Sequence, residues 1–271
     1  MQSNYLKDKL EIIVVDDMSK DGTYEEIHRN FPDIKVVRNN KQRFLAGSRN
    51  IGINNSKGEF LFLVDDDNLL DYRCISELVE LLKSNKQVAI AGPITYYLDE
   101  PKKILFAGVK RNLITSRTIF VAKGQEDNGQ YHYPIDSDDI PNAFMVRRKI
   151  FDKIGLFDEE KFPIHYDEAD FGMRVRRMGY RIIIVPDAKT YHDTRRELRY
   201  FSNPIRIYYA IRNRIVLHRM YLKKLGFLVF LTCFFPLFFI YYSIKSRQIS
   251  ICIMATLDGL TGKDRVREIK F

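Results

Sequence analysis

Nearly continuous apolar runs of strand length alternate with stretches of helical spacing along the first half of the chain. The runs at residues 10–15, 60–64 and 88–92 are almost wholly apolar. Runs of this kind are typical of parallel strands covered on both faces by helices. Between two of them, apolar residues at helical spacing predict an amphipathic helix over 72–85. Its buried face is expected to consist of Ile75, Leu78, Val79 and Leu82.

Turn residues separate the other expected elements. The pattern predicts helices at 23–30, 46–55 and from about 166 to 178, and strands at 35–38, 142–146 and 181–185. Strands that alternate with helices predict an α/β fold with a doubly wound, mostly parallel sheet. Residues 96–141 lose this regularity, and a long irregular stretch in an α/β domain is typical of a functional loop.

The last part of the chain has a different pattern. Residues 225–244 form a segment without a charged side chain. This segment is long enough to cross the core of a bilayer as a helix. Basic residues flank the segment on both sides, so charge does not orient it, and Pro236 is compatible with an interfacial or re-entrant position. A buried core helix is the alternative. We therefore expect a catalytic domain over 1–200 and a helical, membrane-associated tail over 201–271.

Charge and cysteine usage narrow the class of protein. The chain has 271 residues and a formal net charge of +9, and its Lys and Arg residues crowd the second half. Such a bias suits anionic lipid, phosphorylated substrates or nucleic acid, but no RNA-binding motif is present. Cys74, Cys233 and Cys252 lack metal-ligand spacing and indicate a reducing compartment. The first residues lack the apolar core of a signal peptide.

Three consecutive carboxylates follow the apolar run at 60–64. Asp65, Asp66 and Asp67 stand where open α/β sheets bind ligands, at the carboxyl end of a strand. Adjacent carboxylates repel each other and need a cation or a basic partner to stay ionised. If strand geometry continues, Asp65 and Asp67 point the same way and could bind Mg²⁺ or Mn²⁺. The alternative is an acidic turn that caps the next helix.

Four spaced features occur in order along the chain. They are 14–23 (VVDDMSKDGT), then 49–52 (RNIG) with Gly58-Glu59 and the Asp triplet, then 155–159 (GLFDE) with 167–174 (DEADFGMR), and His192. This ordered set resembles the family 2 inverting glycosyltransferases of GT-A fold, in particular their rhamnosyltransferase-like branch. Segments 208–213 (YYAIRN) and 258–263 (DGLTGK) resemble later motifs of that branch, so the resemblance covers about residues 10–265.

Two features depart from the family pattern. Members usually begin with a strand of the type VSIIIPTYN, whereas this sequence begins at what would be the second strand. Either the start is truncated or that strand is lost, and its loss would leave an unpaired position in the sheet. Many members also carry Glu-Asp where this chain has Asp167-Glu168, so the carboxylate at the second position is kept but is one methylene longer.

The resemblance implies a metal-assisted transfer from a nucleoside-diphosphate sugar. Asp65 and Asp67 would hold Mg²⁺ or Mn²⁺ on the diphosphate, with Asp67 as the direct ligand and His192 as a further ligand. A surface or core histidine is the alternative for His192.

The donor nucleotide is expected to contact a second group of residues. Asp16 would accept a hydrogen bond from the base or, alternatively, cap its loop, and Asp17 and Asp66 are assigned to the same donor site. Arg49 could reach the diphosphate, although pairing with a carboxylate on the helix surface is the competing expectation.

An inverting transfer also needs a general base for the acceptor hydroxyl. Glu168 is the candidate, and its neighbours Asp167 and Asp170 are alternatives. Asp170 could instead cap its helix and orient Arg174.

The expected partners are a nucleoside-diphosphate sugar, a glycan or lipid-linked acceptor, and a membrane surface on its cytoplasmic face, with no nucleic acid. Competing functions are a catalytically degenerate nucleotide-sugar binding protein and a nucleotidyltransferase, although no glycine-rich phosphate loop precedes Asp16.

Overall fold

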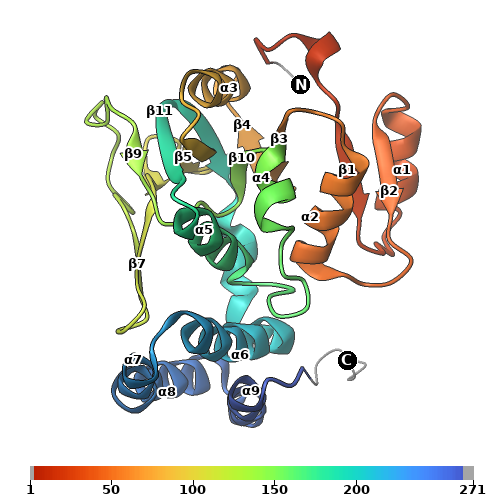
Figure 1. Ribbon diagram of the computed structural model, residues 1–271. Coiled ribbons are helices and arrows are strands. Elements are labelled where there is room, and N and C mark those ends of the chain that lie inside the picture. Colours follow the sequence, from red (N-terminus) through yellow and green to blue (C-terminus); the bar gives the residue numbers. More distant parts are fainter. Residues whose placement is uncertain (1–2, 265–271) are drawn as a thin grey trace.

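A computed structural model describes residues 3–264, apart from the side chains of 196–199 (Figure 1). Its largest sheet has the strand order β3-β10-β5-β11-β4. These strands are β3 (Phe60–Val64), β10 (Ala143–Arg147), β5 (Val88–Tyr97), β11 (Arg181–His192) and β4 (Asn68–Leu70). Two short strands join them, β6 (Ile104–Phe106) on β5 and β9 (Ile135–Asp136) on β11. A separate antiparallel pair consists of β7 (Val109–Asn112) and β8 (Arg117–Phe120).

The large sheet is mixed, so the expectation of a mostly parallel sheet is wrong. Along its main path only β5 and β11 are parallel, whereas β10 runs antiparallel to both β3 and β5 and β4 runs antiparallel to β11. All five residues of β10 are buried. A fully buried strand shows the same continuous apolar run in either direction, because side-chain burial does not report the direction of hydrogen-bonded neighbours.

A second, two-stranded parallel sheet carries the N-terminal elements. β1 (Ile13–Asp16) pairs with β2 (Lys35–Arg38), and α1 (Thr23–Asn30) connects them, after a short 3₁₀ helix at Lys7–Lys9. Within residues 3–264, no strand hydrogen-bonds to the second edge of β1 or of β3. Helix α2 (Phe44–Asn55) bridges the two sheets, since its Gly52 lies against Val15 of β1 and its Ile53 shares a core with Leu61 of β3.

Helices cover both faces of the large sheet. On one face lies α3 (Cys74–Ser84), whose buried side chains include all four of the expected apolar positions. On the other face lie α4 (Arg148–Ile154) and α5 (Asp167–Arg177), packed through Phe151, Phe157 and Phe171. Helix α5 matters most for function because its first turn carries the candidate base.

The tail is helical, and its last helices lie on the side of α6 (Pro204–Tyr221) that faces away from the sheets (Figure 1). After a 3₁₀ segment (Thr194–Ser202) come α6 (Pro204–Tyr221), α7 (Lys224–Val229), a π-helical turn (Phe230–Phe234), α8 (Phe235–Ser246) and α9 (Ile249–Thr261). Residues Lys224–Ser246 form one helix that is long and apolar enough to cross a membrane, and only 11% of its most apolar window is buried. This exposure disfavours a buried core helix.

Candidate active site

The acidic triplet forms a turn between two strands. β3 ends at Val64 and β4 begins at Asn68, so strand geometry does not continue through residues 65–67. Strand alternation therefore does not orient Asp65 and Asp67 together, and the two carboxylates have different partners. Asp66 is exposed at the turn.

Asp67 lies beside His192 because β4 pairs with the end of β11. Asn68 is opposite His192 in the register, and the backbone N–H of Asp193 donates to the carbonyl of Asp67 at 2.9 Å. This places His192 Nε2 3.2 Å from Asp67 Oδ1, with the imidazole buried. The structure thus brings together two residues that are 125 positions apart, and their binding of a metal stays a prediction.

The donor atoms of this pair fit a divalent cation that also binds substrate. In the described part of the chain, no three His, Cys, Asp or Glu side chains are grouped as a complete metal site. Mg²⁺ bound with a nucleotide usually takes only one or two carboxylates, and phosphate and water oxygens complete its coordination. Asp67 and His192 suit that arrangement, whereas Asp65 is engaged elsewhere.

Arg49 is at the centre of a buried cluster of carboxylates. It projects from α2, and its Nη2 lies 2.9 Å from Asp65 Oδ1. Its Nη1 lies 2.8 Å from Asp167 Oδ2 and 2.7 Å from Glu168 Oε1. The ring of Phe144 covers the guanidinium, with its centroid 5.3 Å from Cζ. These contacts favour the carboxylate-paired alternative for Arg49 over contact with the diphosphate.

The cluster shifts the pKa values of the adjacent carboxyls of Asp167 and Glu168 in opposite directions. Burial, reinforced by the charge of Glu168, raises the pKa of Asp167 well above its ordinary value. Burial also acts to raise the pKa of Glu168, but the charge of Arg49 and a hydrogen bond from Asp167 outweigh it and lower that pKa. The two shifts favour the protonated form of Asp167 and the ionised form of Glu168. An ionised carboxylate is what a general base requires.

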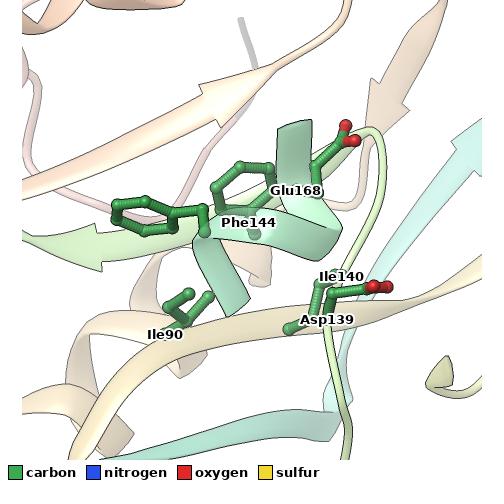
Figure 2. Close-up of a pocket in the computed structure, with 6 residues that line it drawn as sticks. Ile90, Asp139, Ile140, Phe144 and Glu168 are labelled. Carbon is green, nitrogen blue, oxygen red and sulfur yellow. The ribbon is translucent and has the colours of Figure 1, made fainter. Parts of the chain in front are cut away.

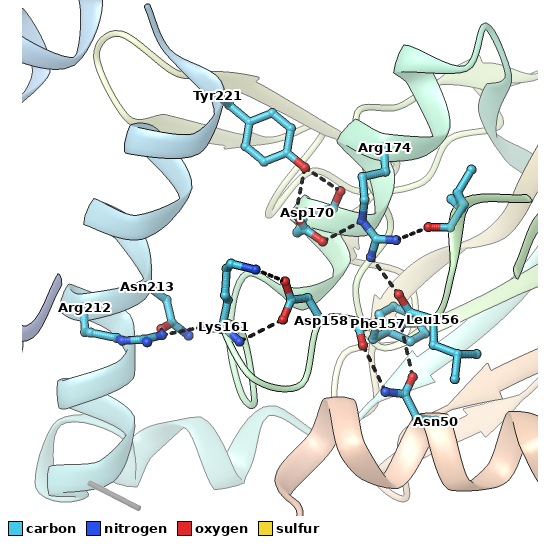
Figure 3. A network of polar contacts seen from close by, with 11 residues as sticks. Asn50, Leu156, Phe157, Asp158, Lys161, Asp170, Arg174, Arg212, Asn213 and Tyr221 are labelled. Carbon is cyan, nitrogen blue, oxygen red and sulfur yellow. Dashed lines mark hydrogen bonds and ion pairs between the residues drawn. The ribbon is translucent and has the colours of Figure 1, made fainter. Parts of the chain in front are cut away.

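Asp170 is held in a different network (Figure 3). Its Oδ2 accepts a hydrogen bond from Arg174 Nε at 2.8 Å, and its Oδ1 accepts one from Tyr221 Oη at 2.7 Å. Arg174 also donates to the backbone carbonyls of Ile154 and Leu156, which fixes the loop after α4. Because Asp170 is buried and both oxygens are used, the geometry favours the orienting role over a role as base.

The two N-terminal aspartates hold loops in place. Asp16 accepts a hydrogen bond from the backbone N–H of Ser19 at 3.0 Å and lies 3.1 Å from Arg38 Nε. Asp17 accepts from the backbone N–H groups of Arg43 and Phe44, both at 2.8 Å, and so caps the start of α2. These contacts support the loop-capping alternative for Asp16. Asp17 caps a helix by these contacts, and its contact with the nucleotide stays a prediction.

The structure places another carboxylate, that of Asp139, beside Glu168, and the sequence pattern did not predict it. A crevice at this point is lined by Ile90, Asp139, Ile140, Phe144, Glu168 and Phe171. In Figure 2, Glu168 and Asp139 direct their carboxylates away from Ile90 and Phe144. Asp139 is buried and forms an ion pair with Arg111 of β7, and burial raises its pKa. The acidic run at 136–139 (DSDD) was the available signal, but it stands in the irregular stretch where no element could be assigned.

Helix α6 holds the turn that leads into α5. His165 and Tyr166 both adopt positive φ, at 63° and 66°, which is uncommon for side chains of this size. Asn213 donates from Nδ2 to the carbonyls of Ile164 at 2.9 Å and His165 at 3.1 Å. The late motif at 208–213 therefore supports the backbone directly before Glu168.

The motif at 258–263 contacts the same helix. Tyr208 Oη donates to the buried carboxylate of Asp258 at 2.9 Å. Arg212 donates from Nε to the carbonyl of Lys263 at 3.2 Å. The two late motifs are therefore one packing unit beneath the site.

Comparison with protein-family models decides the family. The model for glycosyl transferase family 2 matches residues 2–155, more than half of the chain. The chain belongs to glycosyl transferase family 2. It is therefore a glycosyltransferase that transfers a sugar from a nucleotide sugar, and the Asp triplet and Arg49 lie within the matched residues.

Known proteins agree with this glycosyltransferase assignment. The dTDP-rhamnosyl transferase RfbF of Shigella flexneri is 26% identical over 95% of this chain and 88% of its own length. The structure of GalNAc-T7 with UDP, GalNAc and Mn²⁺ aligns at a TM-score of 0.57 and 18% identity, covering 87% of this chain and 51% of that one. The mannosyltransferase PcManGT from Pyrobaculum calidifontis, with GDP-Man and Mn²⁺, aligns at 0.55 and 15% identity over 97% and 81% of the two chains. The two structural likenesses establish the GT-A fold.

Proposed function

We propose that this glycosyltransferase is an inverting, metal-assisted hexosyltransferase that acts on a glycan or lipid-linked acceptor at the cytoplasmic face of a membrane. The observation that carries the proposal is the bridge made by Arg49. One guanidinium joins Asp65, in the acidic turn, to Glu168, in the first turn of α5. A candidate base is therefore fixed beside the turn that carries the candidate metal ligand.

Glu168 has the properties that the transfer step requires. Its carboxylate is ionised, about 15% exposed, and held at one oxygen by Arg49. In a single displacement it would take the proton of the acceptor hydroxyl as the acceptor oxygen bonds to the anomeric carbon and the bond to the diphosphate breaks. Asp167, whose pKa is raised by burial, would keep Glu168 in place by donating a hydrogen bond.

Asp67 and His192 would hold the cation, together with the donor diphosphate. Mg²⁺ or Mn²⁺ bound there would neutralise charge that develops on the leaving diphosphate. The two neighbouring structures were solved with Mn²⁺, and the dTDP-rhamnosyl transferase relative favours a dTDP-sugar as the first donor to try.

The test is a screen of nucleotide sugars with the purified full chain. Release of nucleoside diphosphate is measured with Mn²⁺ and with a chelator, and the anomeric configuration of the product is read by proton NMR. The proposal predicts metal-dependent release and an inverted product. Retention of configuration would contradict it, and donor binding without turnover on any acceptor would support a catalytically degenerate protein instead.

A further inference from the structure

The helix at Lys224–Ser246 exposes an apolar stripe along its whole length. Leu225 at its start is 74% exposed, and Ile244 near its end is 70% exposed. Between them lie Leu228, Leu237 and Ile240, each more than half exposed. Within each half of the helix these residues are three or four positions apart, and the π-helical turn at Phe230–Phe234 separates the two halves. The stripe carries no charged side chain.

Helix α9 extends this surface. Its exposed side consists of Ile249, Ile253, Leu257 and Leu260. Its opposite side packs closely on α6, where a Cβ added to Gly259 would lie 3.0 Å from the Cβ of Ile215. Figure 1 shows α7, α8 and α9 together on the side of α6 that faces away from the sheets. We call the exposed apolar residues of these three helices the tail face. Apolar surface of this extent is uncommon on a soluble monomer unless it binds something.

The other side of the long helix is attached to the body of the enzyme at successive points. Phe230 stacks on His218 of α6, with ring centroids 4.0 Å apart. The ring of Phe238 lies 3.9 Å from Cζ of Arg214. Farther along, the rings of Tyr242 and Phe201 pack together, with their centroids 5.6 Å apart.

These contacts limit how the helix can meet a membrane. From Phe230 to Tyr242 the helix advances about 18 Å at 1.5 Å per residue. A helix that crossed the bilayer would have to leave α6, and Arg214 would lose its contact with the ring of Phe238. The observed packing therefore favours a helix that lies along the enzyme surface.

Basic side chains at the ends of the long helix complete the surface. Residues 203–257 contain no Asp or Glu, whereas Lys223, Lys224, Lys245 and Arg247 stand at the two ends of the long helix. All four of these basic residues are exposed. Basic residues beside an apolar face are attracted to anionic headgroups and are typical of helices that lie in a membrane interface.

We propose that the tail face inserts into one leaflet of an anionic bilayer, with the Lys224–Ser246 helix and α9 lying in the plane of the membrane. The proposal rests on the membrane location proposed above and specifies its geometry. Both ends of the long helix then stay on the cytoplasmic side. The catalytic domain stays on that side too, with α6 between it and the lipid.

Labelling of the two helix ends tests the geometry directly. Lys224→Cys and Lys245→Cys are made separately in a Cys233→Ser background, because the other cysteines, Cys74 and Cys252, are buried. Each full-length variant is bound to vesicles of phosphatidylglycerol and phosphatidylcholine and treated outside with a membrane-impermeant maleimide. We expect both cysteines to react to the same extent with and without detergent. Protection of one of them until detergent is added would show a spanning helix and overturn the proposal.

A second experiment tests whether α9 takes part. The double variant Ile253→Glu, Leu257→Glu should co-sediment with the anionic vesicles at least about tenfold more weakly, since charge is costly in the apolar region. Phe31→Glu is the matched control and should bind normally, because Phe31 directly follows α1 and is 55% exposed. Circular dichroism checks the folding of both variants. Normal binding by the α9 variant, or a self-associated form that ignores vesicles, would refute the proposal. Neither experiment uses a sugar donor, so failure here is distinct from failure of the proposed transferase activity.

Discussion

Replacement of Arg49 by Met should destabilise the enzyme strongly. The substitution keeps an unbranched apolar stem of similar length but leaves Asp65, Asp167 and Glu168 without their shared cation. Removing one partner of a buried ion pair costs about 3–5 kcal/mol. That is a large part of the 5–15 kcal/mol or so that stabilises a typical domain. For a domain of this size it corresponds to a fall in melting temperature of about 6–20 °C.

The loss should also depend on pH. Arg49 lowers the pKa of each of the three carboxyls, so its removal raises all three in the folded protein. Groups with raised folded pKa values lose stability as pH rises above their unfolded values, about 4 for carboxyls. The deficit of the variant should therefore be largest near neutral pH and shrink as pH falls towards that value.

Urea unfolding at several pH values measures both effects. Tyrosine fluorescence and circular dichroism are suitable signals, since the chain has 16 Tyr and no Trp. Arg43→Met is the matched control, because its ion pair with Glu159 is half-exposed and such pairs contribute about 0–1 kcal/mol. Equal destabilisation by the two substitutions, or a deficit for Arg49→Met that does not change with pH, would refute the role given to the cluster.

Two further predictions concern the metal pair and the packing of α5. Asp67→Ala should abolish Mn²⁺-dependent binding of a nucleoside diphosphate in calorimetry, whereas Asp33→Ala in an exposed turn should not; equal affinity with and without chelator would count against the metal site. Gly172→Ala should destabilise the fold by about 1–3 kcal/mol in thermal unfolding, because the added Cβ would lie 2.6 Å from the carbonyl oxygen of Asp138. Gly226→Ala is the control: its added Cβ has room, so this variant should be as stable as the wild type or more stable. A Gly172→Ala variant as stable as the wild type would contradict this packing.

The sequence was most informative where local pattern and burial agree. Helix α1 and strands β2 and β3 have the predicted bounds, and the predicted face of α3 is buried. Strand direction could not be derived in the same way, because β10 is buried whichever way it runs. The extensions of β5 to Tyr97 and β11 to His192 also depend on pairing between distant segments, which a local pattern does not contain.

The candidate site also contains some contacts that the sequence predicted and others that depend on distant segments. Asp67 and His192 were predicted as a pair, and the pairing of β4 with β11 brings them together. The carboxylate partners of Arg49 could not be predicted, because they lie after β3 and in α5, up to 119 residues away in the sequence. Asp139 was missed for a similar reason, as its place beside Glu168 depends on the path of an irregular loop.

The most direct test of the central claim is the turnover of Glu168→Gln. This change removes the proton acceptor and keeps the shape of the side chain, and Glu80→Gln on the exposed side of α3 is the matched control. With a donor identified by the screen, calorimetry should show donor binding retained by both variants. Turnover should fall about 10²–10⁴-fold for Glu168→Gln alone, the usual contribution of a general base. A near-normal rate for Glu168→Gln would contradict the account and move the role of base to Asp167 or Asp170.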